Sequence, residues 1–335
     1  MNDKMKNPKV IIQILHYKDI QDTISCLQSV FELDYKNFEI LVIDNSEKGI
    51  PEELKLIELE KNKQITLIKT GNNKGFTGGH NIGFEFSTDN NADYIWVLNN
   101  DTVVLPDTLS ILVSDIESNA KIGAVSPIIY HHNTDEIQYL ASIINLNNKE
   151  ISYTKSFDQL HAWQNEKKHF CLWGTALLLR TSMLKEIGFF YEELFAYYED
   201  TELSYRILIS NYENKITENS KIYHKHGLIQ SNASLRQPHF YFYMARNKLL
   251  YLKKHSKGLK YIFAIKSSCL SMLEYLCVCL RHNNDTCANA VLDGFYCGIK
   301  DHGGAWKHDI HMPNLLSLFL KRFAWPIHKI LTLKF

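Results

Sequence analysis

Three polar residues stand at the end of an apolar run in the segment DYIWVLNNDTVVLP, residues 93–106. Residues 94–98 form a short apolar run with aromatic and β-branched members, which predicts a buried strand, and Asn99, Asn100 and Asp101 follow it at once. Strong hydrogen-bond acceptors at the end of a buried strand cost free energy unless a partner satisfies them. Asp101 is therefore a candidate ligand-binding carboxylate, and an aspartate that caps a turn or a helix is the alternative.

Polar clusters of this kind follow four of the predicted strands. In an open parallel sheet, ligands bind beyond the carboxyl ends of the strands. One polar strand end is ordinary loop chemistry, whereas four of them together indicate a single pocket. The four clusters are His16 with Tyr17, Asp44 with Asn45, residues 72–75, and residues 99–101.

Glycines precede a predicted helix in the segment NNKGFTGGHNIG, residues 72–83. Glycine permits close approach of the backbone, and the N-terminus of a helix favours anions. The spacing matches neither GxGxxG nor GxxxxGKS/T, so it supports neither a dinucleotide fingerprint nor a P-loop. Taken alone, this turn is more typical of a helix start than of a phosphate site.

Two adjacent acids, Glu199 and Asp200, begin a predicted amphipathic helix over residues 199–211. The N-terminus of a helix keeps a carboxylate ionised, as a general base must be. Acids favour that position in any helix, however. The local sequence therefore leaves both capping and catalysis open.

Strands and helices alternate along the first 130 residues, which predicts an α/β fold with a mostly parallel sheet and helices on both faces. Residues 131–159 are polar and irregular with hairpin-like pieces, and beyond about residue 240 the pattern is helical. The predicted strands span residues 9–15, 38–44, 65–70, 94–98, 122–129, 170–180 and 220–227, and the predicted helices span residues 20–31, with Asp19 as a possible cap, 51–62, 78–87, 106–119 and 199–211.

The composition is that of a globular protein, because 45% of the 335 residues are apolar and 22% are charged. The formal net charge is zero, which does not suggest nucleic-acid binding. Seven scattered cysteines without a zinc pattern indicate reduced, buried thiols in a cytoplasmic protein. The first ten residues contain no apolar h-region, so we expect no secretion signal.

An ordered series of short motifs resembles the family 2 inverting glycosyltransferases of the GT-A fold. It is most similar to the branch of bacterial rhamnosyltransferase-like enzymes of surface polysaccharides. Each motif alone is weak, but the ordered series is specific and covers roughly residues 8–250. The resemblance implies a Rossmann-like sheet of GT-A type. The motifs are VID (42–44), NNKGFTGGHN (72–81), VLNND (97–101), WGTALLLR (173–180), YYEDTELSYR (197–206) and YHKHG (223–227).

In that family, the nucleotide of an activated sugar lies across the first half of the sheet. By resemblance, Asp44 would accept a hydrogen bond from the base, and Asp101 would bind a Mg²⁺ or Mn²⁺ ion that holds the diphosphate. His224 would complete this metal site or contact the diphosphate. Such ions prefer hard oxygen ligands. The nucleotide-sugar site that the resemblance implies comprises His16, Tyr17, Asp44, Asn73, Lys74, Gly75, Gly79, Asn81, Asn99, Asn100 and Asp101.

Two segments depart from this branch of the family. The branch usually reads Asn-Tyr-Asn where this chain has HYK at residues 16–18, and often Asn-Pro-Asp where it has NND at residues 99–101. The first departure changes the expected contacts of His16 and Lys18. The second places an amide at Asn99, where the metal-binding motif has its first acid.

The same resemblance assigns the acceptor side. Asp200 would be the base that takes the proton of the acceptor hydroxyl, with Glu199 beside it as a supporting residue. Trp173 and Gly174 belong to the acceptor-side strand, where an aromatic ring can pack against a sugar, although core packing is an alternative for Trp173. Arg246, in a helix that begins near residue 239, would meet the diphosphate or the acceptor, or pair with a nearby acid.

The resemblance divides the chain at about residue 250. It predicts a catalytic domain over residues 1–250, with a nucleotide-sugar half over about 8–130 and an acceptor half over about 131–250. The remainder, residues 251–335, is a helical, partly amphipathic region. Residues 257–335 contain ten Lys or Arg against five Asp or Glu, and the last 21 residues mix these cations with apolar residues. This pattern suits a helix in an anionic membrane interface, and packing on the catalytic domain is the alternative.

These features together predict a metal-dependent hexosyltransferase, peripheral on the inner face of the cytoplasmic membrane. It would move rhamnose or another hexose from a UDP- or dTDP-sugar to a lipid-linked bacterial surface glycan, such as a capsule or O-antigen precursor. A sugar nucleotidyltransferase is one alternative. Such an enzyme would require a glycine-rich basic loop soon after the first strand, where this chain has the segment HYKDIQD, residues 16–22. A binding protein that keeps the fold without turnover is the other. The three histidines in residues 301–313 match no metal motif and are expected in a solvated or interfacial loop.

Overall fold

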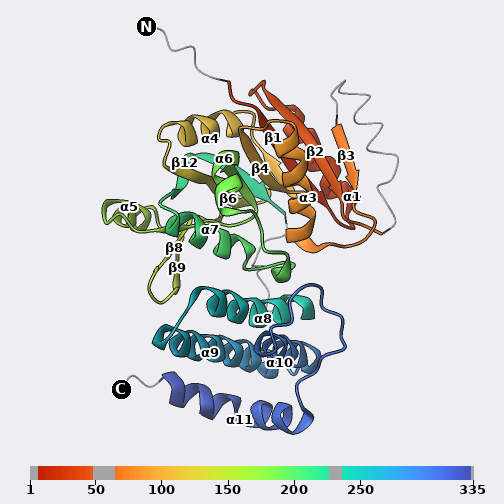
Figure 1. Ribbon diagram of the computed structural model, residues 1–335, viewed down its shortest axis with the longest axis vertical. Helices are drawn as coiled ribbons and strands as arrows, with labels where there is room; N and C mark the ends of the chain where they lie inside the picture. Colours follow the sequence, from red (N-terminus) through yellow and green to blue (C-terminus); the bar gives the residue numbers. More distant parts are fainter. Residues whose placement is uncertain (1–6, 48–64, 226–235, 333–335) are drawn as a thin grey trace. The chain divides into compact units, whose positions relative to one another are not determined.

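The structure is a computed structural model in which residues 7–47, 65–225 and 236–332 are described (Figure 1). The chain divides into two compact units, each with its own core. One, here called the sheet unit, comprises residues 1–146, 150–190 and 200–229. The other, the helical unit, comprises residues 147–149, 191–199 and 230–335. The helical unit therefore includes the segment that ends at Glu199.

A mixed sheet forms the centre of the sheet unit. Four parallel strands lie in the order β3-β2-β1-β4, and antiparallel β11 joins β4 to β6. Strand β12 runs parallel to β6, and the short β5 pairs with β12 in the opposite direction. The strands are β1 Val10–His16, β2 Phe38–Asp44, β3 Ile65–Lys69, β4 Tyr94–Asn99, β5 Thr102–Val104, β6 Ile122–His131, β7 Ile137–Tyr139, β11 Ala176–Arg180 and β12 Glu213–His224.

Helices cover both faces of this sheet, because successive side chains of a strand point to opposite sides. Ile12 of β1 packs in one cluster with Leu27 of α1, whereas Ile11 packs in another with Phe86 of α3. The arrangement confirms the predicted α/β fold with helices on both faces. These helices are α1 Ile20–Phe31, α3 Gly75–Asp89, α4 Thr108–Glu117, α6 Thr181–Ile187 and α7 Glu199–Ile209.

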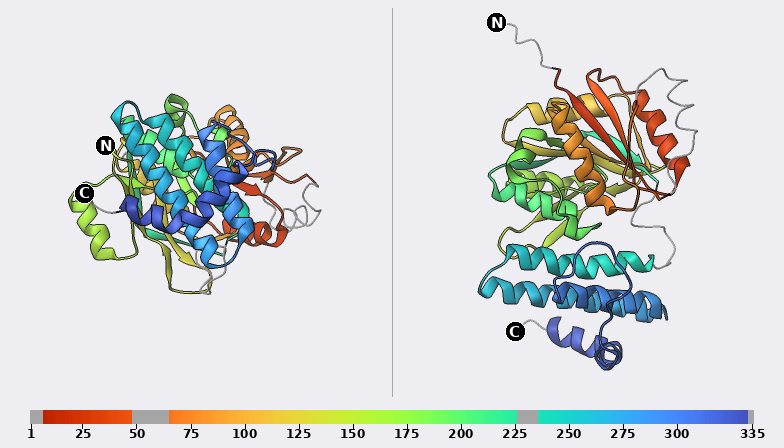
Figure 2. Two further views of the ribbon diagram at one scale, coloured as in Figure 1. Left: turned by 90° about the horizontal axis from the view of Figure 1, so that it is seen from below. Right: turned by 45° about the vertical axis from the view of Figure 1, so that its right-hand side comes forward.

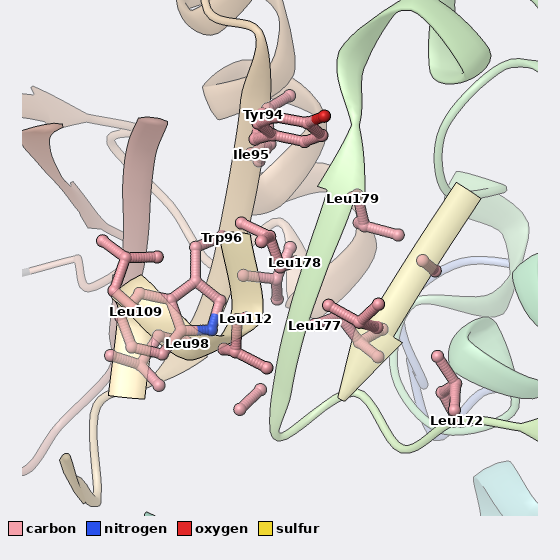
Figure 3. Close-up of a cluster of buried hydrophobic side chains, with 14 of the residues drawn as sticks. Tyr94, Ile95, Trp96, Leu98, Leu109, Leu112, Leu172, Leu177, Leu178 and Leu179 are labelled. Atoms are coloured by element: carbon pink, nitrogen blue, oxygen red, sulfur yellow. The ribbon is translucent and has the colours of Figure 1, made fainter. Parts of the chain in front are cut away.

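The strand before the polar residues 99–101 is fully buried, as predicted. Trp96 and Leu98 of β4 lie in the same apolar cluster as Leu109 and Leu112 of α4, and all four are fully buried (Figure 3). Burial of an apolar side chain of this size contributes about 1.5–3 kcal/mol. The end of β4 is therefore held rigidly, which fixes the position of the residues that follow.

Several elements differ from those predicted. The expected strand over residues 170–180 is two strands, β10 Phe170–Cys171 and β11, separated by residues 172–175. Strand β10 belongs to a small separate sheet with β8 Ala141–Ile144 and β9 Ile151–Thr154. Helix α5, Phe157–Asn165, was not predicted, and it begins with Ser156 as a cap. The helix predicted over residues 51–62 lies outside the described residues.

The described part of the helical unit contains four long helices around a common apolar core. Figure 2 shows how these helices are arranged. Its helices are α8 Pro238–His255, α9 Leu259–Arg281, α10 Asp285–Ile299 and α11 Asn314–Thr332. Helix α8 packs against α9 and α10, and α11 packs against α9 and α10. The boundary predicted at residue 250 would divide α8, which belongs to this unit throughout.

One helix among the described residues has the length and composition of a membrane span. Helix α9 has 23 residues and a window of mean hydropathy 1.5, and 39% of that window is buried within the protein. Leu273 and Leu276 of α9 belong to the core of the helical unit. A buried core helix passes the same criterion, so the finding is weak evidence for a span.

Candidate active site

The register of the parallel strands brings the polar strand ends together. His16 at the end of β1 pairs with Asp44 at the end of β2, and Asp44 in turn pairs with Lys69 of β3. On the other side, Leu15 pairs with Asn99 at the end of β4. The four polar clusters therefore lie at one edge of the sheet, as the sequence predicts.

Asp44 is a buried carboxylate with one unoccupied oxygen. Its Oδ1 accepts hydrogen bonds from the backbone N–H of Ser46 at 3.0 Å and from the Ser46 hydroxyl at 2.5 Å. Its Oδ2 has no partner among the described residues, although Asp44 is only 1% exposed. A buried acceptor without a partner is costly. This oxygen is placed to accept a hydrogen bond from a ligand.

Two asparagines build the loop between β3 and α3. The side-chain oxygen of Asn45 accepts from the backbone N–H of Lys74, and that of Asn73 accepts from the N–H of Gly75, both at 2.9 Å. Gly75 has φ +74°, which a residue with a side chain rarely adopts. The Lys74 side chain is exposed at the rim. Asn73 thus shapes the loop, and Lys74 is the member of this group that is free to reach a ligand.

Two residues of α3 have structural tasks in place of the predicted ligand contacts. A Cβ at Gly79 would overlap the side chain of Leu15 on β1, so this glycine permits close packing of helix on strand. Asn81 pairs with the backbone of Phe190, donating to its carbonyl at 2.9 Å and accepting from its N–H at 3.2 Å. We therefore correct the assignment of Gly79 and Asn81 to the nucleotide-sugar site.

The end of β1 is tied to β4 through Thr23 of α1. The Thr23 hydroxyl lies 2.8 Å from Nδ1 of His16 and accepts from the side-chain amide of Asn100 at 2.9 Å. Burial lowers the pKa of His16, and the nearby Asp44 and Asp19 act in the opposite direction. His16 is therefore neutral and buried at the end of β1. Its neighbour Tyr17 is 40% exposed and accessible to a ligand.

Asp101 and His224 face each other because β5 pairs with β12. Asp101 lies in the turn before β5, and the register of that pair sets His224 opposite Thr102. Nε2 of His224 lies 3.0 Å from Oδ1 of Asp101, without the direction of a hydrogen bond.

The tautomer of His224 is set by Gln138 on β7. The Gln138 amide oxygen lies 2.7 Å from Nδ1 of His224 and can only accept, so Nδ1 carries a proton. The amide nitrogen of Gln138 completes this orientation by donating to Nδ1 of His131 at 3.3 Å. Nε2 of His224 therefore presents its lone pair toward Asp101 in the neutral ring, as a metal ligand does.

The residues present fit a divalent cation with two protein ligands. The described residues contain no group of three or more His, Cys, Asp or Glu that could hold a metal ion by themselves. Asp101 supplies a carboxylate and His224 an imidazole nitrogen, and both suit Mn²⁺. Phosphate oxygens and water usually complete such a site. The predicted pair Asp101 and His224 is thus brought together by the fold.

Asp200 lies at the start of α7 with its carboxylate held by backbone groups. The N–H of Gly174 donates to Oδ2 at 3.0 Å, and the N–H of Thr201 donates to Oδ1 at 2.6 Å. Burial raises the pKa of Asp200, and these N–H groups act in the opposite direction. Part of the residue remains accessible to solvent. A raised pKa and solvent access suit a general base.

The first turns of α7 are anchored by a buried ion pair. Arg206 donates from Nε to both carboxylate oxygens of Glu202, at 2.8 and 2.9 Å, and both residues are buried. Its remaining nitrogens donate to the carbonyls of Ile187, Gly188 and Phe189. A bidentate, fully hydrogen-bonded pair of this kind fixes geometry. The helix that carries Asp200 is therefore immobilised against the end of α6.

Trp173, beside Gly174, belongs to a group of aromatic rings. It stacks on Tyr139 with ring centroids 4.2 Å apart and an interplanar angle of 20°, and Tyr153 of β9 meets its edge at 6.4 Å. Tyr139 is buried and donates its hydroxyl to the carbonyl of Cys171 at 2.6 Å. Trp173 is therefore partly packed and partly open, with Tyr153 largely exposed next to it.

Arg246 has a structural task that excludes the predicted contact with substrate. It lies in α8 of the helical unit and is only 1% exposed. Its guanidinium donates to the side-chain oxygen of Asn247 and to the carbonyls of Glu193, Leu194 and Gly304. Every guanidinium nitrogen is engaged by protein oxygens. We therefore correct its assignment to the acceptor side.

Comparison with known proteins identifies the family of the chain. The family described as glycosyl transferase family 2 matches residues 12–188. The chain is 24% identical over 234 residues to the dTDP-rhamnosyl transferase RfbF of Shigella flexneri, covering 68% of this chain and 74% of that protein. It is 26% identical over 203 residues to a poly-beta-1,6-N-acetyl-D-glucosamine synthase of Staphylococcus epidermidis, covering 58% of this chain and 44% of that protein. The chain therefore spans less than half the length of this second relative.

Solved structures share the fold at low sequence identity. The mannosyltransferase PcManGT of Pyrobaculum calidifontis, solved with GDP-Man and Mn²⁺, superposes with a TM-score of 0.53 at 12% identity, covering 98% of this chain and 84% of that one. TarS of S. aureus superposes with a TM-score of 0.55 at 16% identity, covering 96% and 53%. The matched family accounts for more than half of the residues. With its α/β fold of GT-A type, this chain belongs to glycosyl transferase family 2.

Proposed function

We propose that this protein is a metal-dependent, inverting hexosyltransferase. It takes rhamnose or another hexose from a UDP- or dTDP-sugar and adds it to a growing, lipid-linked bacterial surface glycan, such as a capsule or O-antigen precursor. The observation that carries the proposal is the Asp101–His224 pair, with facing atoms 3.0 Å apart beyond the carboxyl end of β4. RfbF of S. flexneri, by its name a dTDP-rhamnosyl transferase, supports the choice of donor.

The nucleotide lies across the ends of β1 and β2 in this proposal. Asp44 accepts a hydrogen bond from the base with its unoccupied Oδ2. Tyr17 and Lys74 line the entrance, and both are exposed there. His16 and Asn73 shape the floor and the loop through the contacts described above. A ligand that donates to Asp44 removes the cost of its buried oxygen.

Asp101 and His224 would hold the divalent ion beside the diphosphate. When bound, such an ion would supply charge that stabilises the leaving diphosphate. Gln138 holds His224 in the tautomer that this task needs. Asn99 contributes its backbone rather than a charge, since its carbonyl accepts from the Thr102 hydroxyl at 2.7 Å. This bond tightens the turn that presents Asp101.

Asp200 acts as the base of a direct displacement. The acceptor oxygen forms a bond to the anomeric carbon as its proton passes to Asp200, and the bond from that carbon to the diphosphate breaks. The acceptor oxygen attacks from the face opposite to the diphosphate, so the configuration at that carbon inverts, and the electron pair of the broken bond leaves with the diphosphate. Glu199 directly precedes Asp200 and acts as its supporting residue. Gly174 holds the carboxylate through its N–H, and Trp173 offers an aromatic face to the acceptor glycan.

The helical unit attaches the enzyme to an anionic membrane on its cytoplasmic side, without spanning it. Leu315 of α11 is 84% exposed and Phe263 of α9 is 68% exposed, which is unusual for apolar side chains of this size. Exposed cations accompany them at Lys260, Arg322 and Lys329. Apolar residues mixed with basic ones are typical of helices that lie in a membrane interface. A lipid-linked acceptor would be delivered at such a surface.

A thermal-shift screen with UDP-, dTDP- and GDP-sugars tests the donor assignment, with and without Mn²⁺. A ligand that binds the native state raises the apparent stability. We expect one nucleotide class to raise the melting temperature only when Mn²⁺ is present, and Asp44→Asn to weaken this response. Absence of a shift with every donor would contradict the proposal. Release of free sugar from the selected donor then distinguishes an enzyme from a protein that binds without turnover.

A further inference from the structure

The chain just before Asp200 follows a path that aromatic residues rarely adopt. Phe195, Tyr197 and Tyr198 have φ angles of +64°, +67° and +70°. Bulky side chains in this left-handed region are outliers, and each costs on the order of 1–3 kcal/mol unless the surroundings impose it. All three lie in the segment 191–199 of the helical unit, here called the acid-preceding loop. Something must hold this loop in its strained form.

Two adjacent residues of α8 supply that hold. Asn247 is fully buried, and its amide nitrogen donates to three carbonyls of the loop, those of Leu194, Ala196 and Tyr197, at 2.7 to 2.8 Å. Its amide oxygen accepts from Nε of Arg246 at 2.8 Å, which orients the group. Arg246 itself donates to the carbonyls of Glu193 and Leu194. The pair therefore binds the carbonyls of four of the five residues from Glu193 to Tyr197.

A third segment closes the arrangement and explains a motif that the sequence left unassigned. The carbonyl of Gly304 accepts from Arg246 at 2.6 Å, and its N–H donates to the carbonyl of Glu193 at 2.7 Å. A Cβ at Gly303 would lie 2.8 Å from that same carbonyl oxygen, so only glycine fits there. Trp306 stacks on Phe242 of α8 at 4.5 Å. The segment 301–313 is thus a brace on the loop and α8.

We propose that Arg246 and Asn247 are positioning residues for the transfer reaction, which hold the acid-preceding loop and thereby set where Glu199 and Asp200 lie. The inference rests on the proposed role of Asp200 as base. In this proposal, Arg246 and Asn247 contact the backbone of the loop and do not contact the substrate. Because the loop is joined to Asp200 by the peptide bond of Glu199, release of the loop displaces the base while the donor site, built on other strands, is left intact.

The test compares Asn247→Asp with Asn289→Asp, an identical chemical change at an exposed position of α10. Asn247→Asp keeps the shape but turns three donated hydrogen bonds into contacts between oxygens. Hydrogen exchange followed by mass spectrometry reports on the peptide that contains residues 191–199. We expect faster exchange there, a fall in kcat on the order of a hundredfold, and an unchanged donor Kd, since small displacements of a catalytic group cost about this much. Asn289→Asp should change none of these.

Arg246→Lys serves as the second variant, because it keeps the charge and the bond to one carbonyl and is expected to fold where Asn247→Asp does not. Unchanged exchange of the loop in a folded variant would overturn the inference, as would faster exchange with an unchanged kcat. Asp200→Asn, assayed in parallel, separates the two claims. If Asp200→Asn is inactive while the α8 variants are fully active, the positioning role is wrong. If Asp200→Asn is itself active, the proposed base is wrong.

Discussion

At the scale of single residues, hydrogen bonds within the protein orient the side chains of Asp44 and His224. These bonds leave one polar atom of each side chain for a ligand. Asp44 keeps Oδ2 without a hydrogen-bond partner among the residues that the structure describes, and His224 turns Nε2 toward Asp101 because Gln138 engages its other nitrogen. Atoms of this kind are ready to bind a ligand without first breaking a bond within the protein. The binding energy is therefore available for the ligand itself.

Replacing Asp101 with asparagine should abolish metal-dependent donor binding and leave the fold intact. The change removes the charge that faces His224, and divalent ions of this class prefer carboxylate oxygens. Isothermal titration calorimetry of the nucleoside diphosphate, with and without Mn²⁺, measures the effect. Asp107→Asn, at an exposed aspartate that makes no side-chain capping bond, is the matched control. Retention of the Mn²⁺-dependent affinity in Asp101→Asn would show that the metal role is wrong.

The sequence predicted the strand-end residues better than those on helices. Polar residues at the carboxyl ends of neighbouring parallel strands lie at one edge of the sheet, so the placement of Asp44 and Asp101 could be predicted from the pattern alone. Gly79 and Asn81 follow the same motif but lie within α3, where neighbouring elements decide their contacts. The family resemblance placed Arg246 at the diphosphate, at the acceptor or beside an acid, whereas the structure shows it buried and bound to backbone carbonyls. Gln138 gave no signal, because it lies in a segment without a motif.

At the scale of elements, the fit between α3 and β1 determines where the β3–α3 loop lies. Gly83 lies against β1, and a Cβ there would come within 2.7 Å of the side chain of Gln13 and within 2.8 Å of Ile43. We expect Gly83→Ala to reduce the free energy of unfolding by about 1–3 kcal/mol through overpacking, despite the better helix propensity of alanine. Urea unfolding measures it, with Glu85→Ala on the exposed face of α3 as the control. A stabilised Gly83→Ala would mean that the helix moves freely on the sheet.

Helices and strands could be predicted where their apolar residues follow the pattern typical of a helix or of a buried strand. Strands β1, β2 and β4 are mostly apolar, and α1 has the predicted cap, since Asp19 accepts from the N–H groups of Gln21 and Asp22. The break between β10 and β11 was missed because apolar residues precede and follow residues 172–175 in the sequence. Strand β5 is three residues long and exists through its pairing with β12. Such tertiary pairing has no local signature, and here it brings Asp101 and His224 together.

At the scale of the whole molecule, the helical unit should carry the attachment to membranes. Each basic residue near an anionic surface contributes on the order of 1 kcal/mol, and salt screens this attraction. We expect flotation with anionic liposomes at low salt, weaker flotation at high salt, and little with neutral liposomes. The double reversal Arg322→Glu with Lys329→Glu should reduce binding. Reversal of Lys121 and Lys185, exposed in the sheet unit, should not.

Equal binding to anionic and neutral liposomes would instead indicate insertion of apolar surface, with α9 as the candidate span. Absence of binding to either would assign the exposed residues of α11 to a contact between protein chains. Both outcomes would remove the electrostatic attachment from the proposal. The catalytic assignment would stand in either case, since it depends on residues of the sheet unit and on Glu199.

The rate at which Asp200→Asn releases sugar from the donor tests the central claim most directly. The measurement uses saturating Mn²⁺ and the donor that the thermal-shift screen selects, with donor affinity determined in parallel. We predict unchanged donor affinity and a rate lower by about 10²- to 10⁴-fold, as expected on loss of a general base. In the wild type, the rate should fall as pH drops through the raised pKa of Asp200, because the base must be deprotonated. A variant that turns over at nearly the wild-type rate, with the same pH profile, would contradict the account.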